Sequence, residues 1–84
     1  MEKLPQVVMD IVVAFGKVGQ VMTPRRLYER MLAQERPYFP TLRDKILPDL
    51  EERGLVKRTR VSKDLVMYEL LGVNNMKEFH DDQA

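Results

Sequence analysis

Hydrophobic residues recur at helical spacing in three stretches of the chain. The first stretch ends before two glycines, Gly16 and Gly19, which favour the end of a helix. The second follows Thr23 and Pro24, the arrangement typical of an N-cap and a proline in the first helical turn. The pattern therefore predicts helices over residues 4–16, 24–34 and 41–53.

The third predicted helix carries signals at both ends and in its middle. Thr41, with Asp44 three positions later, is typical of an N-cap with a capping box. Gly54 is expected to cap the other end. Pro48 lies inside the helix, where it removes one backbone hydrogen bond and is expected to kink or loosen the last turns. The side chains predicted to be buried are Leu42, Ile46, Leu47 and Leu50.

After Gly54 the pattern changes to two short strands separated by a polar turn at Ser62-Lys63-Asp64. The strands are predicted over residues 55–61 and 65–71, and residues 20–22 could form another short strand. The expected fold is therefore α+β, with three helices and a C-terminal two-stranded β-hairpin in one domain over residues 4–72. Residues 73–84 are expected to form a short, mobile tail.

Composition narrows the function classes. The chain has 84 residues, enough for one small domain, and has no cysteine for a disulfide or a thiolate metal site. His80 is the only histidine, and there is no glycine-rich phosphate loop or nucleophile–base pair. We therefore expect no enzyme activity, no metal and no cofactor. The longest apolar stretch is short and is interrupted by Asp10, so a soluble, cytoplasmic protein without a membrane span is predicted.

Charge is distributed unevenly along the chain, although the net charge is only +1. Residues 23–63 hold eleven basic and six acidic residues, a net charge of +5, and the remainder of the chain carries −4. A basic middle between acidic ends suits a surface that binds a polyanion.

Two sequence motifs resemble the winged helix-turn-helix superfamily. One is Thr23-Pro24-Arg25-Arg26-Leu27-Tyr28, and the other is Leu47-x-x-Leu50-Glu51-x-x-Gly54-Leu55-Val56. The resemblance covers residues 4–71 and does not identify a subfamily. It implies a small DNA-binding transcriptional regulator whose third helix enters the major groove and whose hairpin, the wing, touches the DNA backbone. The small size would suit a phage, plasmid or archaeal-virus protein.

Candidate DNA contacts lie on the second helix, the third helix and the wing. Asp44 is expected either to cap the third helix or to accept a hydrogen bond from a cytosine amino group. The acidic residues of this helix leave a protein-binding winged helix open as the alternative, and the apolar first helix suggests a homodimer. The predicted DNA-binding residues are Arg25, Arg26, Thr41, Arg43, Lys45, Lys57, Arg58, Arg60 and Lys63.

Overall fold

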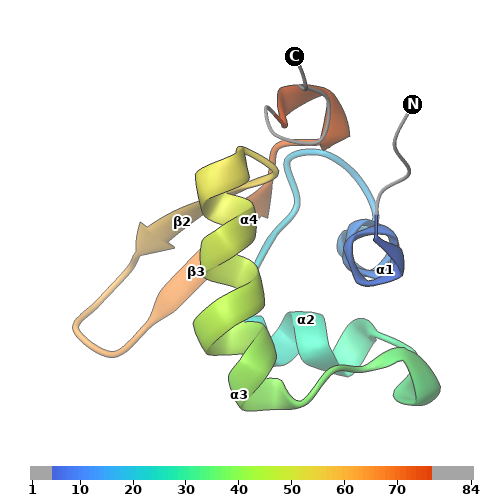
Figure 1. Cartoon of the computed structure of the whole chain (residues 1–84). Helices are drawn as coiled ribbons and strands as arrows, with labels where there is room; N and C mark the ends of the chain where they lie inside the picture. Colours follow the sequence, from blue (N-terminus) through green and yellow to red (C-terminus); the bar gives the residue numbers. More distant parts are fainter. Residues whose placement is uncertain (1–4, 77–84) are drawn as a thin grey trace.

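The computed structural model describes residues 5–76, which form helices and one antiparallel sheet (Figure 1). The α+β class is confirmed. In chain order the elements are α1 (Gln6–Phe15), β1 (Val21–Met22), α2 (Pro24–Arg30), the 3-10 turn η1 (Ala33–Glu35), α3 (Phe39–Thr41), the π-helical turn η2 (Leu42–Ile46), α4 (Leu47–Arg53), β2 (Val56–Arg60), β3 (Val66–Leu70) and the 3-10 turn η3 (Val73–Asn75).

The elements α3, η2 and α4 form one continuous helical segment, residues 39–53. In Figure 1 this segment stands upright in the middle of the molecule, with the β2–β3 hairpin on its left and α1 and α2 on its right. The far end of the hairpin therefore projects away from the helices.

The helix α2 begins as predicted and ends earlier than predicted. The Thr23 hydroxyl accepts a hydrogen bond from the Arg26 backbone N–H at 3.1 Å, which confirms the N-cap. The helix stops at Arg30 instead of residue 34. The Arg36 guanidinium donates to the Met31 and Glu29 carbonyls, both at 3.2 Å, and so satisfies acceptors that a helix end leaves open.

Thr41 does not cap the third helix, because the helix begins two residues earlier, at Phe39. Pro40 falls in the first turn, where its missing N–H has no intrahelical partner to lose. Thr41 is thus inside the helix, and the Asp44 carboxylate pairs with Arg43. The predicted capping box is therefore wrong.

Pro48 is accommodated by a wider turn that precedes it. The Leu47 backbone N–H donates to the Leu42 carbonyl, five residues back, which makes η2 a π turn. The residues after Pro48 continue as regular α-helix up to Gly54, which has a φ of 92° in the left-handed region. The helix loosens before the proline and not in its last turns.

The sheet has three strands, whereas the sequence predicted a two-stranded hairpin. Strand β1 joins the free edge of β3, with Val21 opposite Glu69 and Met22 opposite Tyr68, so that the strand order is β1-β3-β2. Hydrogen bonds between Gly19 N–H and the Leu70 carbonyl, and between Leu70 N–H and the Gln20 carbonyl, extend this pairing.

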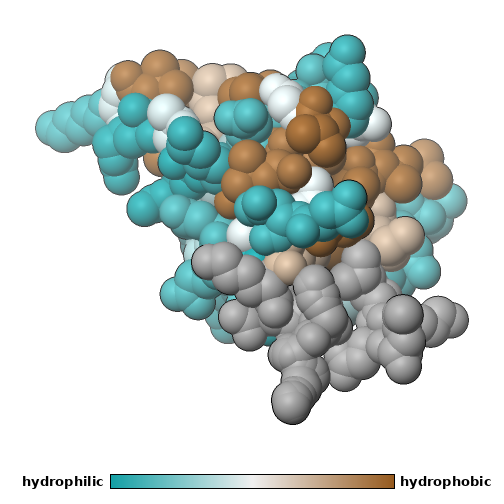
Figure 2. Space-filling model, turned by 90° about the horizontal axis from the view of Figure 1, so that it is seen from above, coloured by the Kyte–Doolittle hydropathy of each residue, from teal (hydrophilic) through white to brown (hydrophobic). Residues whose placement is uncertain are grey.

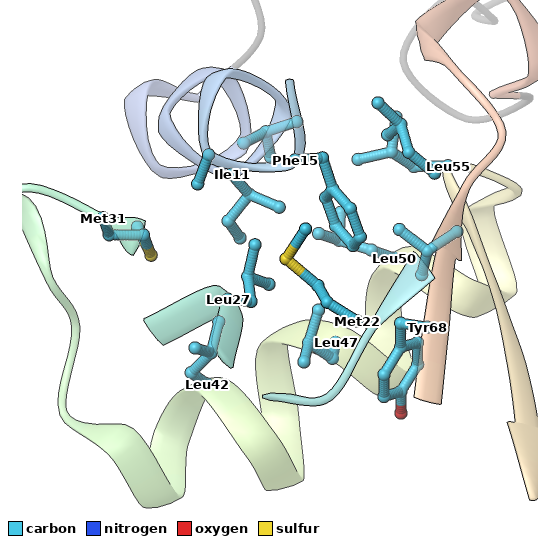
Figure 3. Close-up of a cluster of buried hydrophobic side chains, with 14 of the residues drawn as sticks. Ile11, Phe15, Met22, Leu27, Met31, Leu42, Leu47, Leu50, Leu55 and Tyr68 are labelled. Atoms are coloured by element: carbon cyan, nitrogen blue, oxygen red, sulfur yellow. The ribbon is translucent and has the colours of Figure 1, made fainter. Parts of the chain in front are cut away.

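The core lies where α1, the 39–53 segment and the base of the sheet meet (Figure 3). Phe15 reaches into the cluster from α1, and Leu50 is buried beside it, as predicted. Leu42 and Leu47 are also fully buried, whereas Ile46 is only half-buried at the edge. Burial of these side chains is the main stabilising contribution to so small a domain.

Three apolar residues in and after α1 are exposed, although the sequence pattern makes them candidates for the core face of the helix. Met9 and Val13 lie on the outer face of α1, and Val18 follows it; 75% of Val13 is accessible to solvent. The inner face of this short helix is already filled by Val8, Ile11 and Phe15.

The start of the predicted tail packs against the domain. Met76 is buried, and the Asn75 side chain donates to the Gly54 carbonyl at 2.7 Å. Residues 77–84, including Phe79 and His80, lie outside the described residues.

Candidate nucleic-acid interface

The two faces of the sheet have different surroundings. Strand residues alternate between faces, and Arg58 is directly opposite Tyr68 on β3, with Met22 next in the same row. This row continues the face that carries the buried Val56 and Leu70. Arg58 is therefore on the face that the 39–53 segment covers.

A groove of about 540 Å³ opens between the start of α2, the 39–53 segment and this face of the hairpin. Three arginines that are distant in the sequence line it: Arg25 from α2, Arg43 from η2 and Arg58 from β2. The acidic residues Asp44 and Asp64 line it as well. The other lining residues are Thr23, Pro24, Phe39, Pro48, Leu65, Val66 and Tyr68.

An aromatic pair holds two of the arginines in place. The rings of Tyr28 and Phe39 meet edge to face, with their centroids 5.3 Å apart. The guanidinium carbon of Arg25 lies 4.3 Å from the Phe39 centroid, and that of Arg43 lies 5.5 Å from it. These are cation–π distances, so the cationic groups of two helices converge on one ring.

Arg43 is also engaged by its neighbour. Its Nε and Nη2 atoms each donate to one oxygen of the Asp44 carboxylate, both at 2.8 Å. The hydrogen bond from Arg43 lowers the pKa of Asp44, and the same bond and the charge of Asp44 raise the pKa of Arg43. At neutral pH the pair is fully ionised and has no net charge.

Arg58 has a looser partner. Its Nε lies 3.6 Å from a carboxylate oxygen of Glu51 on α4, a distance too long for a good hydrogen bond. Tyr68 is directly opposite Arg58 in the sheet and is almost fully buried. Desolvation is the main cause that raises the pKa of its hydroxyl; the charge of Glu51 adds to the rise and that of Arg58 opposes it. In Figure 3 this hydroxyl points away from the apolar cluster.

Ion pairs neutralise much of the acidity of the helical segment. Among the described residues, three of its four acids pair with arginines: Asp44 with Arg43, Asp49 with Arg53 at 2.8 Å, and Glu51 with Arg58. The negative charge that the sequence places on this helix is therefore largely compensated.

The structure brings together three of the nine residues predicted to contact DNA and leaves six outside the groove. Lys57 is on the opposite face of β2 from Arg58, because neighbouring strand residues alternate, and it lies across from Glu69. Arg60 donates from Nη1 to the Lys63 carbonyl at 2.8 Å and so braces the hairpin turn. The residues outside the groove are Arg26, Thr41, Lys45, Lys57, Arg60 and Lys63.

Phe39 and Tyr68 line the groove, a position that their sequence context indicates only weakly. Phe39 stands between two prolines, a context that predicts a turn, and Tyr68 belongs to an ordinary alternating strand. Tyr68 lies near an arginine because the strand register pairs it with Arg58. Phe39 lies near arginines because the helix starts at this residue.

Residues 5–76 contain neither a metal-binding cluster nor a membrane-spanning helix. No group of three His, Cys, Asp or Glu side chains in this part of the chain could hold a metal ion. None of its helices is long and apolar enough to cross a membrane.

The sequence matches no protein-family model, and no curated protein shows significant similarity to it.

Proposed function

We propose that this chain is a winged helix-turn-helix domain that binds duplex DNA and acts as a small transcriptional regulator in the cytoplasm. The element order supports the proposal, because three helical regions are followed by a hairpin whose inner strand also pairs with β1. In this proposal the 39–53 segment is the recognition helix and the β2–β3 hairpin is the wing. The role is binding and involves no catalysis.

The observation that carries the proposal is the convergence of Arg25, Arg43 and Arg58 on one groove from three separate elements. Arg43 is neutralised by Asp44, so Arg25 and Arg58 are the phosphate-binding candidates in the groove. Arg58 and Glu51 are partly exposed and 3.6 Å apart, so a phosphate can replace Glu51 at little cost. The other basic side chains, among them Arg26, would extend the positive potential around the groove.

The test is a mobility shift with mixed-sequence duplex DNA at about 50 mM and about 200 mM salt. The wild type should bind, and its affinity should fall steeply with salt because counterions are released from phosphates. Arg58→Ala should weaken binding to all sequences and reduce the salt slope by about 0.9, the value of one phosphate contact.

Lys57→Ala is the matched control, since it removes one positive charge from the adjacent residue on the opposite face. It should change the salt slope less than Arg58→Ala. Absence of binding by the wild type at low salt would overturn the proposal. Equal effects of the two substitutions would show that the groove is not the DNA-binding site.

A second candidate function, protein binding, rests on the apolar surface of α1. Met9, Val13 and Leu32 are exposed, and Val13 and Leu32 line a hollow of about 280 Å³ beside Asp10 and Arg30. Seen from above, hydrophobic side chains reach the molecular surface between hydrophilic ones (Figure 2). Such a surface suits a protein partner or a second copy of the chain.

Sedimentation equilibrium distinguishes a second copy from other partners. If α1 forms a homodimer, Val13→Asp should give monomers, and Val61→Asp, a matched change at an exposed residue of the hairpin, should not. A wild type that is monomeric would exclude the homodimer.

A further inference from the structure

The ion pair between Arg43 and Asp44 leaves one edge of the guanidinium open. Asp44 takes the side edge, which consists of the Nε–H and one N–H of Nη2. A guanidinium has five N–H donors, so the end edge, with one donor each from Nη1 and Nη2, is available as far as residues 5–76 are concerned. Both side chains are about half exposed, at 51% and 56%, and both line the groove.

The position of this open edge is fixed by two contacts. Asp44 holds the side edge through two parallel hydrogen bonds, and the Phe39 ring lies 5.5 Å from the guanidinium carbon. An arginine side chain normally loses much rotamer freedom when it binds, and this one is already restrained. An exposed ion pair contributes little to stability, so its fixed geometry matters more for recognition than for folding.

We propose that Arg43, positioned by Asp44, recognises guanine in the major groove of duplex DNA through guanine O6 and N7. This inference rests on the proposed DNA-binding function. Guanine presents these two acceptors side by side, at the spacing of the two end-edge donors. Adenine replaces O6 with an amino group, which is a donor and cannot accept from arginine.

The charge of the pair explains why guanine is favoured over a phosphate. The pair has no net charge, and a phosphate approaching Arg43 would meet the Asp44 carboxylate. The edge of guanine is uncharged, so it can use the two donors without that repulsion. Arg43 therefore contributes to sequence discrimination, and Arg25 and Arg58 contribute to salt-dependent affinity. Asp44 is a positioning residue, and its acidity is not an obstacle to DNA binding.

The experiment starts from the duplex that the wild-type protein selects out of a random pool. Each G·C pair of that duplex is then replaced by A·T, and each guanine separately by 7-deazaguanine, which lacks N7. At one position the wild type should lose about 5- to 150-fold in affinity on replacement by A·T, and part of that on loss of N7. The salt dependence should not change, because no phosphate contact is lost.

Two variants test the roles within the pair. Arg43→Lys keeps the charge but cannot make the bidentate contact, and Asp44→Asn keeps the shape of the side chain but removes its charge. Both should lose discrimination at that one position and keep non-specific binding. Arg53→Lys and Asp49→Asn are matched controls, because they alter the other 2.8 Å arginine–aspartate pair of the helical segment, and neither residue lines the groove.

The outcomes separate this inference from the proposed function. If the wild type shows no salt-dependent binding to any duplex, both are overturned. If it binds and its guanine preference persists in Arg43→Lys and Asp44→Asn, the inference is overturned and the DNA-binding proposal stands. Circular dichroism of each variant verifies that it is folded.

Discussion

The base and the tip of the β2–β3 hairpin have different surroundings although they belong to the same two strands. At the base, Leu55, Val56 and Leu70 are buried against the helices. Toward the tip, the face that carries Val56 and Leu70 carries Arg58 and Arg60 instead. Val61 and Leu65, next to the turn, are exposed. The comparison shows that one alternating pattern can supply buried core residues at one end and exposed cationic residues at the other, depending on what covers the sheet.

The strongest test of this difference uses one substitution at both ends of the hairpin. Leu55 is fully buried, and 40% of Leu65 is exposed. Leu55→Ala should lower the free energy of unfolding by about 2–5 kcal/mol, because it leaves a cavity in the core. Leu65→Ala should cost less than about 1 kcal/mol. Urea denaturation of both variants measures the two values, and similar losses would show that base and tip are equally packed.

The turn that leads into the base provides a second test. Gly54 and Gly19 both have a positive φ, 92° and 93°, so alanine at either position should cost about 1–2 kcal/mol in backbone strain. At Gly54 a Cβ would also lie 2.7 Å from the Asn75 backbone oxygen, whereas at Gly19 nothing lies within 4 Å. Gly54→Ala should therefore destabilise more than Gly19→Ala in thermal unfolding. Equal costs would mean that residues 73–76 do not hold the base of the hairpin.

The smallest expected change in stability comes from the ionisation of Tyr68, which lies between the base and the tip of the hairpin. Its pKa is raised in the folded protein above the ordinary value of 10.0, chiefly by desolvation. Above pH 10 the unfolded chain loses this proton more readily than the folded protein, so stability should fall as the pH rises through the folded pKa. The measurement is the urea midpoint of unfolding from about pH 8 to about pH 11, a range that includes the ordinary tyrosine pKa. The midpoint should fall with pH in the wild type and should fall less in Tyr68→Phe. If the two proteins respond alike, Tyr68 ionises as freely as in the unfolded chain.

Local signals in the sequence predicted much of the fold. Thr23 and Gly54 act through groups within a few residues of themselves, so the N-cap and the left-handed end could be identified directly. Leu50 was placed in the core by spacing alone. The errors arose where distant groups decided the outcome. Arg36 ends α2 from outside the helix. The short strand suggested at residues 20–22 is present as β1, but its pairing with β3, which adds a third strand to the sheet, was not predicted.

The candidate groove was harder to predict than the fold. The basic residues predicted to bind DNA included Arg25, Arg43 and Arg58 together with six others. Alternation along a strand puts Arg58 and Lys57 on opposite faces, but only the pairing of β2 with β3 shows that Arg58 is on the face that continues the core. The acids of the helical segment favoured the protein-binding alternative, because an ion pair such as that of Glu51 with Arg58 on β2 is not visible in a linear sequence. The place of Phe39 depended on where the helix starts.

The π turn before Pro48 also sets the angular phase of the helix surface. A regular α-helix advances by about 100° per residue, so positions five apart point in clearly different directions. The π turn η2 contains one residue more than an α-helical turn, which offsets one such rotation. Arg43 consequently lines the same groove as Pro48, five residues later. Without the π turn, Arg43 would be turned by about 100° relative to α4. A backbone irregularity associated with one proline thus determines which side chain faces the groove.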